Sequence, residues 1–179
     1  MAILPIRVYP DPMLRLRCQE VTAFDAELSR LAADMVETMH AAPGVGLAAP
    51  QVGTGIRLAV VDLSVGEDAA ALHVLVNPEL VAEEGRESEV EGCLSLPGIS
   101  EKVERARAAR IRFRDLGGET RELAAEGWLA RTVLHEMDHL YGVLIVDRLR
   151  GLRRERARRL LKKLGEPEER AWDAAGSRR

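Results

Sequence analysis

The segment HEMDH, residues 135–139, constrains the fold of this chain more than any other part of it. Side chains four positions apart lie on one face of an α-helix, so His135 and His139 can bind a single ion, at about 2.0–2.1 Å if it is zinc. Apolar residues predict this helix over about 127–141: Leu129, Val133, Leu134, Met137 and Leu140. Gly142 is suited to end it. The motif therefore predicts a helix that presents a metal on one face.

Glu136, beside the first histidine, suits a catalytic role better than a ligating one. Its offset of one position keeps it off the coordinating face, yet it can reach a water bound to the metal. Lone histidines are more often core or surface residues, but HExxH fixes three residues at a spacing that this chemistry needs. A catalytic site of this kind needs a third protein ligand and one open position.

The third ligand has two possible sources in the sequence. Four glutamates follow the helix, where a thermolysin-like zinc peptidase has its ligand: Glu155, Glu166, Glu168 and Glu169. Upstream, Cys93 follows a glycine in "EGCLSLPG", and a loop or strand end presents a thiolate easily. A lone cysteine is more often a small buried apolar side chain. Beside an incomplete two-histidine site we favour Cys93 as the ligand, whereas Cys18 is expected to be structural.

The rest of the chain predicts a mixture of helices and strands. Apolar residues at spacings of three and four predict a helix over 25–40. Runs rich in Val and Leu predict strands at 57–63 and 72–78, and alternating apolar and basic residues predict another at 109–116. Two glycines turn that strand toward "ETRELAAE". Strands before and between helices indicate an α+β domain.

A basic segment, "RLRGLRRERARRLLKK" at 148–163, stands out by its charge. It holds nine Lys or Arg against one Glu, so it carries +8 and the remaining chain −11, for a net charge of −3. Its apolar residues predict an amphipathic helix: Leu149, Leu152, Ala157, Leu160, Leu161 and Leu164. Such a charge run is usually a solvated face. We divide the chain into a catalytic domain at 1–147, this helix at 148–164 and a polar tail at 165–179.

Composition predicts a cytoplasmic globular protein. A length of 179 residues suits one domain, and 46% hydrophobic with 31% charged residues is ordinary for a soluble protein. No apolar run approaches the roughly 20 residues that cross a bilayer, and Pro5, Arg7 and Pro10 interrupt any signal-peptide core. Two cysteines are no disulfide framework. We therefore expect no membrane partner.

Three stretches occur in a recognisable order: "GVGLAAPQ" (44–51), "EGCLSLP" (91–97) and "HEMDHLYG" (135–142). Together they resemble the signature motifs of the peptide deformylase family, whose members remove the N-formyl group from the initiator methionine of new bacterial proteins. The similarity covers about residues 3–150. It implies a compact α+β fold with small mixed or antiparallel sheets around a central HExxH helix, followed by a C-terminal helix.

The resemblance also implies a role for each site residue. It implies three metal ligands: Cys93, His135 and His139. Glu136 would be the general acid/base. Gln51 would donate its side-chain amide, and Leu94 its backbone N–H, to the developing oxyanion.

The resemblance implies one divalent cation, Fe²⁺ in most family members, which Zn²⁺, Ni²⁺ or Co²⁺ can replace. Such a metal lowers the pKa of its bound water from about 15.7 toward 7, and Glu136 takes the proton as the hydroxide attacks the formyl carbon. Glu136 then returns the proton to the leaving amine, and formate is released.

The expected substrate is an N-formylmethionyl nascent peptide. The glycines of "GVGLAAPQ" are expected to let an extended peptide pair with the backbone, although the stretch alone indicates only a turn and an apolar strand. We assign substrate binding to five residues: Val45, Gly46, Gly92, Trp128 and Leu129. Val45, Trp128 and Leu129 are the candidates for the wall of a methionine pocket. Asp138 is expected to support the ligands rather than to bind metal.

Two departures from the family pattern leave room for a relative with a shifted substrate: Leu134 stands where Gln is usual, and Ile145 where Phe is common. Two rival functions also stay open. One is an HExxH zinc peptidase. The other is a non-catalytic RNA- or ribosome-binding protein with a structural metal. Because a deformylase acts on chains that emerge from the ribosome, the resemblance also implies that the basic helix could dock on ribosomal phosphate, with salt-dependent affinity.

Overall fold

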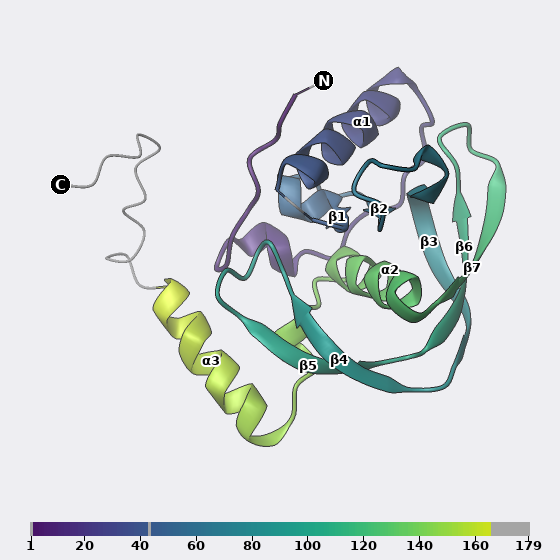
Figure 1. Cartoon of the computed structure of the whole chain (residues 1–179). Helices are drawn as coiled ribbons and strands as arrows, with labels where there is room; N and C mark the ends of the chain where they lie inside the picture. The colour runs from purple at the N-terminus through teal and green to yellow at the C-terminus, as the bar shows by residue number, and fades with distance from the viewer. Residues whose placement is uncertain (1, 43, 166–179) are drawn as a thin grey trace.

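The computed structural model describes residues 2–42 and 44–165 and has an α+β fold (Figure 1). The α-helices of these residues are α1 (Ala26–Ala41), α2 (Gly127–Leu140) and α3 (Gly151–Gly165). The strands are β1 (Gly46–Ala48), β2 (Leu58–Asp62), β3 (Leu72–Glu84), β4 (Glu87–Gly92), β5 (Ser100–Arg105), β6 (Ala108–Arg114) and β7 (Thr120–Glu126). No helix in the described part is long and apolar enough to span a membrane.

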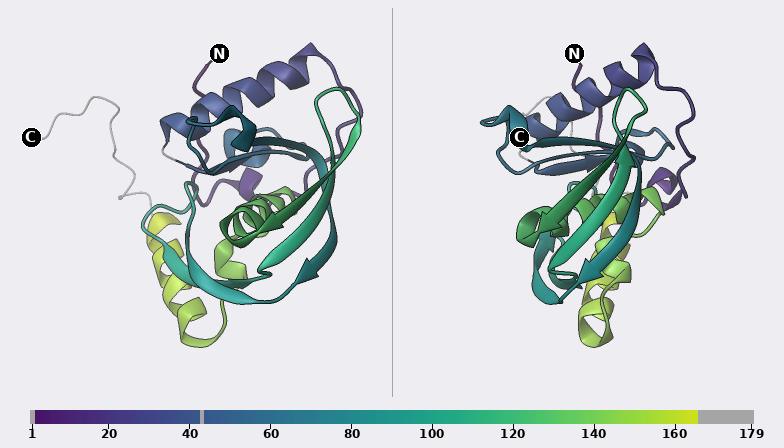
Figure 2. Two further views of the ribbon diagram at one scale, coloured as in Figure 1. Left: turned by 45° about the vertical axis from the view of Figure 1, so that its right-hand side comes forward. Right: turned by 90° about the vertical axis from the view of Figure 1, so that its right-hand side faces the viewer.

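Two antiparallel sheets enclose helix α2. Five strands form one sheet in the order β1-β2-β3-β6-β7, and β4 pairs with β5 in a separate hairpin. Figure 2 shows both sheets curving around α2, while α1 covers the outer side of β1 and β2. The expected fold class, with small sheets around a central HExxH helix, is confirmed.

Helix α1 matches its predicted range and covers one core. The Asp25 side chain accepts hydrogen bonds from the Glu27 and Leu28 amides, both at 3.0 Å, which satisfies free N–H groups at the helix start. Its apolar face then packs on the first two strands, in a cluster that includes Met35, Met39 and buried residues of β1 and β2. This packing fixes the position of β1, which carries part of the site.

Helix α2 is enclosed on nearly all sides. Ten of its fourteen residues are buried, including both histidines of the motif. Val133 and Met137 pack against the inner face of the five-stranded sheet. The helix ends before Gly142, where φ is +71° and an added Cβ would lie 2.7 Å from the carbonyl carbon of Arg15. Only glycine fits this turn without strain, so the predicted end of the helix has a steric cause.

Strand β3 extends well beyond the predicted 72–78. Pro78 cannot donate to a sheet ladder and would ordinarily interrupt a strand. The structure instead shifts register between Val76 and Glu79, with Asn77 at φ +51°. The Asn77 side chain is held by two 2.8 Å hydrogen bonds with the Val21 backbone. The proline therefore sits in an irregularity that the strand passes through.

Helix α3 begins three residues later than the basic segment and packs on the domain. Ala157 and Leu161 are buried in one cluster with Leu149 and residues of β5. Leu152 corrects the predicted apolar stripe, because its side chain is 83% exposed. It lies nine positions before Leu161, about two and a half turns, and so on the opposite side of the helix. Residues 166–179, most of the predicted tail, lie outside the described residues.

Candidate metal centre

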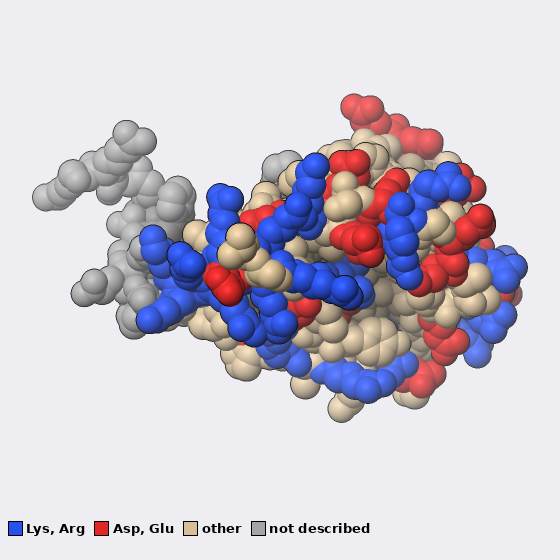
Figure 3. Space-filling model, turned by 90° about the horizontal axis from the view of Figure 1, so that it is seen from below, with Lys and Arg blue, Asp and Glu red and all other residues tan. Residues whose placement is uncertain are grey.

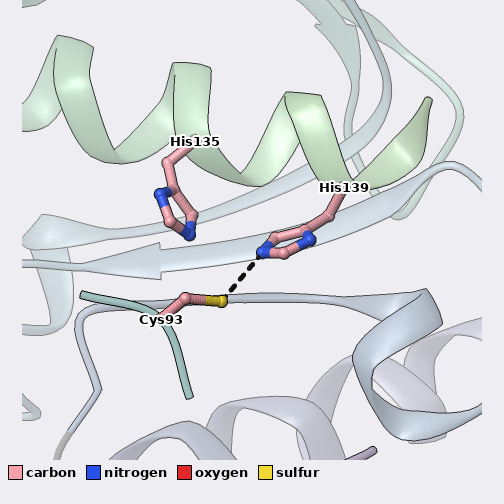
Figure 4. Close-up of side chains that lie close together, drawn as sticks. All are labelled: Cys93, His135 and His139. Carbon is pink, nitrogen blue, oxygen red and sulfur yellow. Dashed lines mark hydrogen bonds between the residues drawn. The ribbon is translucent and has the colours of Figure 1, made fainter. Parts of the chain in front are cut away.

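Three predicted ligands converge between α2 and the end of β4 (Figure 4). His135 and His139 project from the same face of α2, and Cys93 directly follows the last residue of β4. One ligand atom from each residue lies within 4.8 Å of the other two. Cys93 Sγ is 3.3 Å from His139 Nε2. The sequence therefore placed Cys93 correctly at a strand end beside the motif.

The donor set fits a divalent metal. One sulfur and two ring nitrogens are ligands for borderline cations such as zinc and ferrous iron. Burial, reinforced by the nearby charges of His135 and Arg105, lowers the pKa of His139 well below its usual 6.5. Its imidazole is thus neutral, the form that binds a metal. His139 Nδ1 is buried without a hydrogen-bond partner among the described residues, and Nε2 is the ring nitrogen that faces Cys93.

His135 is oriented by a carboxylate behind it. Its Nδ1 lies 3.0 Å from Glu91 Oε2, which leaves the other ring nitrogen to face Cys93. Burial alone would lower the pKa of His135, but contacts with Cys93 and Glu91 raise it to about 10. A cation bound between the thiolate and the ring would take the place of that proton.

Glu91 is held in place by two buried arginines. Arg105 donates from Nε to Oε1 at 2.6 Å and from its Nη2 to Oε2 at 2.9 Å, and Arg131 donates from Nη1 to Oε1 at 2.6 Å. Burial alone would raise the pKa of Glu91, but hydrogen bonds from His135 and Arg105 outweigh it and lower the pKa to about 2. The carboxylate therefore stays ionised behind the metal ligand.

Asp138 supports this arrangement, as predicted, and is not among the ligand atoms that converge. Its Oδ2 accepts a hydrogen bond from Arg105 Nη1 at 2.8 Å, and Arg148 pairs with both of its oxygens. Of the charges in this network, sequence reasoning gave a role only to Asp138. Glu91 was visible in the motif as an acidic residue near the ligand Cys93, but Arg105 and Arg131 carried no recognisable signal.

Glu136 lies beside the ligands and is buried. Its Oε2 is buried without a hydrogen-bond partner among the described residues. Burial raises the pKa of Glu136 to about 7, against the opposing charges of His135 and Arg105. An added Cβ on Gly46 would lie 2.9 Å from Glu136 Cδ, so only glycine allows β1 to approach so closely. This carboxyl can exchange a proton near neutral pH.

Gln51 and Leu94 border the same cavity as the metal ligands. The Ala48 amide donates to Gln51 Oε1 at 2.8 Å, which turns the amide nitrogen toward the site. That nitrogen lies 3.2 Å from Ser95 Oγ and 3.8 Å from Cys93 Sγ. Leu94 follows the ligand cysteine and lines the same cavity. Two donors are therefore near the ligand thiolate.

A cavity of about 520 Å³ opens beside the metal ligands. Four of the predicted substrate-binding residues line it: Val45, Gly46, Gly92 and Trp128. Leu129 corrects the prediction, because it packs with the core cluster between α2 and the sheet. It is one position beyond Trp128, and a step of about 100° turns it away from the cavity.

The family model for polypeptide deformylase matches residues 3–155. The chain belongs to the polypeptide deformylase family. A peptide deformylase of Acidobacterium capsulatum is 48% identical over 164 residues, covering 92% of this chain and 96% of the relative. One of Alkalilimnicola ehrlichii is 51% identical, covering 92% of each chain.

Solved deformylase structures share the fold. The crystal structure of a peptide deformylase from Legionella pneumophila has a TM-score of 0.85 and 42% identity, and covers 94% of this chain and 99% of that one. A Synechococcus elongatus deformylase in complex with actinonin has a TM-score of 0.84 and 40% identity, covering 92% and 89%. As a deformylase the chain is an enzyme, a metal-binding hydrolase with a Cys–His–His group.

The rival sites find no support in the described residues. Glu155 is exposed on α3 and is not grouped with the histidines, and Glu166, Glu168 and Glu169 lie outside the described residues. A closed structural site would use four protein ligands. The group found within residues 2–42 and 44–165 has three, and Cys93 and His135 border the cavity.

The two departures from the family pattern lie away from the ligands. Leu134 faces the opposite side of α2, where it packs against the sheet and lines a small cavity of about 220 Å³. Ile145 is buried in the cluster that holds α3. His40, to which the sequence assigns no role, has its Nε2 2.8 Å from Asp62 Oδ2. Cys18, expected to be structural, is buried in a small core cluster.

Proposed function

We propose that this deformylase removes the formyl group from the N-formylmethionine at the start of newly made proteins and releases formate. One observation carries the proposal: Cys93, His135 and Glu136 border the same cavity as the donors Gln51 and Leu94. Ligands, a proton-transfer group and oxyanion donors are therefore all within reach of one bound carbonyl. This combination suits hydrolysis of a small amide.

The proposed cofactor is one divalent cation, Fe²⁺ in the native enzyme, held by Cys93, His135 and His139. The thiolate also allows Zn²⁺, Ni²⁺ or Co²⁺. When bound, the cation would supply Lewis-acid activation of water and of the formyl carbonyl.

Glu136 moves the proton in this proposal. Its buried carboxylate takes a proton from the attacking water and returns it to the amine of methionine as the C–N bond breaks. A pKa raised to about 7 by burial suits both steps, because the group can accept and release a proton at neutral pH. Gly46, which has no side chain, leaves room for the Glu136 carboxyl at the cavity wall.

Gln51 and Leu94 stabilise the charge that builds on the formyl oxygen. The Gln51 amide is fixed through its oxygen by Ala48, so its N–H groups are aligned before substrate binds. Such preorganised donors act strongly in a site that excludes water, and removing one costs about 10²–10³ in kcat. Val45 and Trp128 border the same cavity and are the proposed contacts for methionine, with Gly46 and Gly92 admitting the peptide backbone.

We place this activity in the cytoplasm, at the ribosome. Lys and Arg side chains gather on the surface around α3 (Figure 3). A groove between the β4–β5 hairpin and α3 is lined by several cations: Arg86, Lys102, Arg148, Arg150, Arg153 and Arg154. Phosphate-rich ribosomal RNA is the complementary partner, with affinity that falls as salt rises. The division at 147/148 into catalytic domain and basic helix remains a prediction.

The decisive experiment measures formate release from a formyl-Met-Ala-Ser peptide by anaerobically purified protein, together with its metal content. Anaerobic handling protects a thiolate-bound ferrous ion. We expect turnover with one equivalent of metal, mostly iron. Cys93→Ala should lose both metal and turnover, whereas Cys18→Ala, the matched change in the core, should keep both. Fully metallated wild-type protein that releases no formate would contradict the proposal.

A further inference from the structure

Arg148 differs from the other arginines of the basic segment, because its guanidinium turns toward α2. Its Nε and Nη2 pair with the two carboxylate oxygens of Asp138, in a two-pronged contact. Arg153, five positions on, is exposed on α3 and has no ion pair among the described residues. Both residues line the basic groove. Arg148 and Arg153 are therefore close in sequence but differ in environment: Arg148 is paired with Asp138, and Arg153 is exposed.

The contact of Arg148 leads through buried side chains to a metal ligand. Asp138 Oδ2 accepts from Arg105 Nη1 at 2.8 Å, while Arg105 Nε and Nη2 reach Glu91 at 2.6 and 2.9 Å. Glu91 Oε2 lies 3.0 Å from His135 Nδ1. Arg105 and Glu91 are almost fully buried, with side chains 2% and 4% exposed. The connection is thus continuous; its inner part, Arg105 and Glu91, is shielded from water, whereas the Arg148 side chain at its outer end is 43% exposed.

We propose that Arg148 is a positioning residue for the deformylase reaction: through Asp138, Arg105 and Glu91 it fixes the imidazole of the metal ligand His135. The proposal rests on the proposed function for its kinetic part only. Its structural part concerns how firmly this chain holds a metal, and that can be measured without turnover.

The geometry explains why Asp138 needs this second arginine. Its side chain is 11% exposed and borders the small cavity on the far side of α2, together with Arg105 and Arg148. Arg148 holds both carboxylate oxygens, so the plane of the carboxylate is fixed. Without that hold, Asp138 is free to rotate toward the cavity and Arg105 Nη1 loses its aligned acceptor. Arg105 is then held by Glu91 alone. The Glu91 carboxylate behind His135 is in turn held less firmly in position.

The same arrangement connects α3 to the site. Leu149, the next residue, is buried in the cluster that contains Ala157 and Leu161 of α3. Arg148 is therefore anchored from both sides, by α2 through its guanidinium and by α3 through its neighbour. Residue 148 is therefore connected to the metal centre through Asp138, although the sequence places it first in the basic segment.

The test compares Arg148→Met with Arg153→Met, which removes the same charge from the same groove. Co²⁺-loaded protein is mixed with excess chelator, and the rate of metal loss and the thiolate-to-cobalt absorption band are recorded. Losing a group that contacts a ligand directly costs about 10–100-fold in metal affinity. Because Arg148 acts through three intermediates, we expect metal loss about 3- to 10-fold faster in Arg148→Met, with a shifted band. Arg153→Met should have the same rate of metal loss and the same absorption band as the wild-type protein.

Kinetics and a second variant separate positioning from general damage. Arg148→Met should lower kcat and leave KM unchanged, since the cavity that binds methionine is not touched. Arg148→Lys keeps the charge but cannot grip both oxygens, so it should restore the band only in part. In an Asp138→Asn background, Arg148→Met should add no further effect.

Equal metal loss and equal spectra in Arg148→Met and Arg153→Met would overturn the proposal. So would additive effects of Arg148→Met and Asp138→Asn. Failure of the proposed function has a different signature: wild-type protein that releases no formate. The comparison of metal-loss rates retains its meaning in that case, because it does not depend on turnover.

Discussion

Helices α2 and α3 are similar in length and carry many charged or polar side chains, but they use them in opposite ways. Helix α2 buries His135, Glu136, Asp138, His139 and an arginine. Helix α3 buries Ala157 and Leu161, and its arginines are exposed. The comparison shows that a charged side chain in this molecule affects folding and the metal site more when it is buried than when it is exposed.

The physical reason is the cost of removing a charge from water. A buried carboxylate must be paired and hydrogen-bonded, and removing its partner leaves an uncompensated charge. Glu91 meets that requirement with Arg105, Arg131 and His135. An exposed arginine on α3 stays hydrated and is screened by salt, so it affects association more than folding.

The largest expected effect follows from replacing the proton-transfer group. Glu136→Gln keeps the shape of the side chain but removes its basicity, so kcat should fall by about 10²–10⁴ while metal content stays near one equivalent. Formate release and metal analysis on the same sample measure both. Glu155→Gln makes the same change on exposed α3 and should leave kcat unaltered. Substantial turnover by Glu136→Gln would remove Glu136 from the mechanism.

The next effect concerns stability rather than turnover. Glu91→Gln leaves Arg105 and Arg131 buried without their shared carboxylate, which should cost about 3–5 kcal/mol of unfolding free energy. Urea unfolding of the metal-free protein measures it, so that metal loss does not contribute. Glu155→Gln is again the matched control, with a change within about 0.5 kcal/mol. Equal midpoints for the two variants would show that the network adds nothing to folding.

The contrast between the two helices also explains what the sequence could predict. The HExxH spacing and the helical period are local, so α2 and its two histidine ligands were predictable. Cys93 is distant in sequence and was chosen because the two-histidine site needs a third ligand. The amphipathic pattern of α3 was predictable too, except for Leu152, which lies about two and a half turns before Leu161 and so on the solvent side. Leu129 failed for a related reason, since a single helical step decides whether a residue meets the cavity.

The buried network was not predictable from local pattern. The β4–β5 hairpin reads as "ESEVEG" and "SEKVER", with charged residues on both faces, and was missed as a pair of strands. Glu91 and Arg105 face inward there, and their partners come from α2, up to 44 positions along the chain. Alternation of polar and apolar residues cannot identify a strand when the side chains on its buried face are themselves charged.

A smaller effect is expected where a buried carboxylate lies away from the metal. Burial alone would raise the pKa of Asp62, but hydrogen bonds from Ser64, Gly66 and His40 lower it to about 2, against an ordinary 3.8. As pH falls, Asp62 takes up its proton at a higher pH in the unfolded chain than in the folded protein. The stabilisation by the ionised carboxylate is therefore present above about pH 4 and is lost as pH falls through 2. Its size is about 2 kcal/mol. Asp62→Asn should flatten the unfolding free energy over this range, and an unchanged pH profile would contradict it.

The smallest effect on folding, and the sharpest on association, is expected on α3. Replacing Arg154 and Arg158 by Gln should change the unfolding free energy by less than about 0.5 kcal/mol, since both are exposed. Co-sedimentation with ribosomes over a salt series should show a slope of log K against log salt reduced by about one for each lost phosphate contact. The control replaces Arg30 of α1 and Arg110 of β6, which are exposed outside the basic segment. If the Arg154/Arg158 and Arg30/Arg110 replacements reduce the slope equally, ribosome binding depends on the net charge of the protein and not on the basic surface of α3. The charges of that helix then only keep it hydrated.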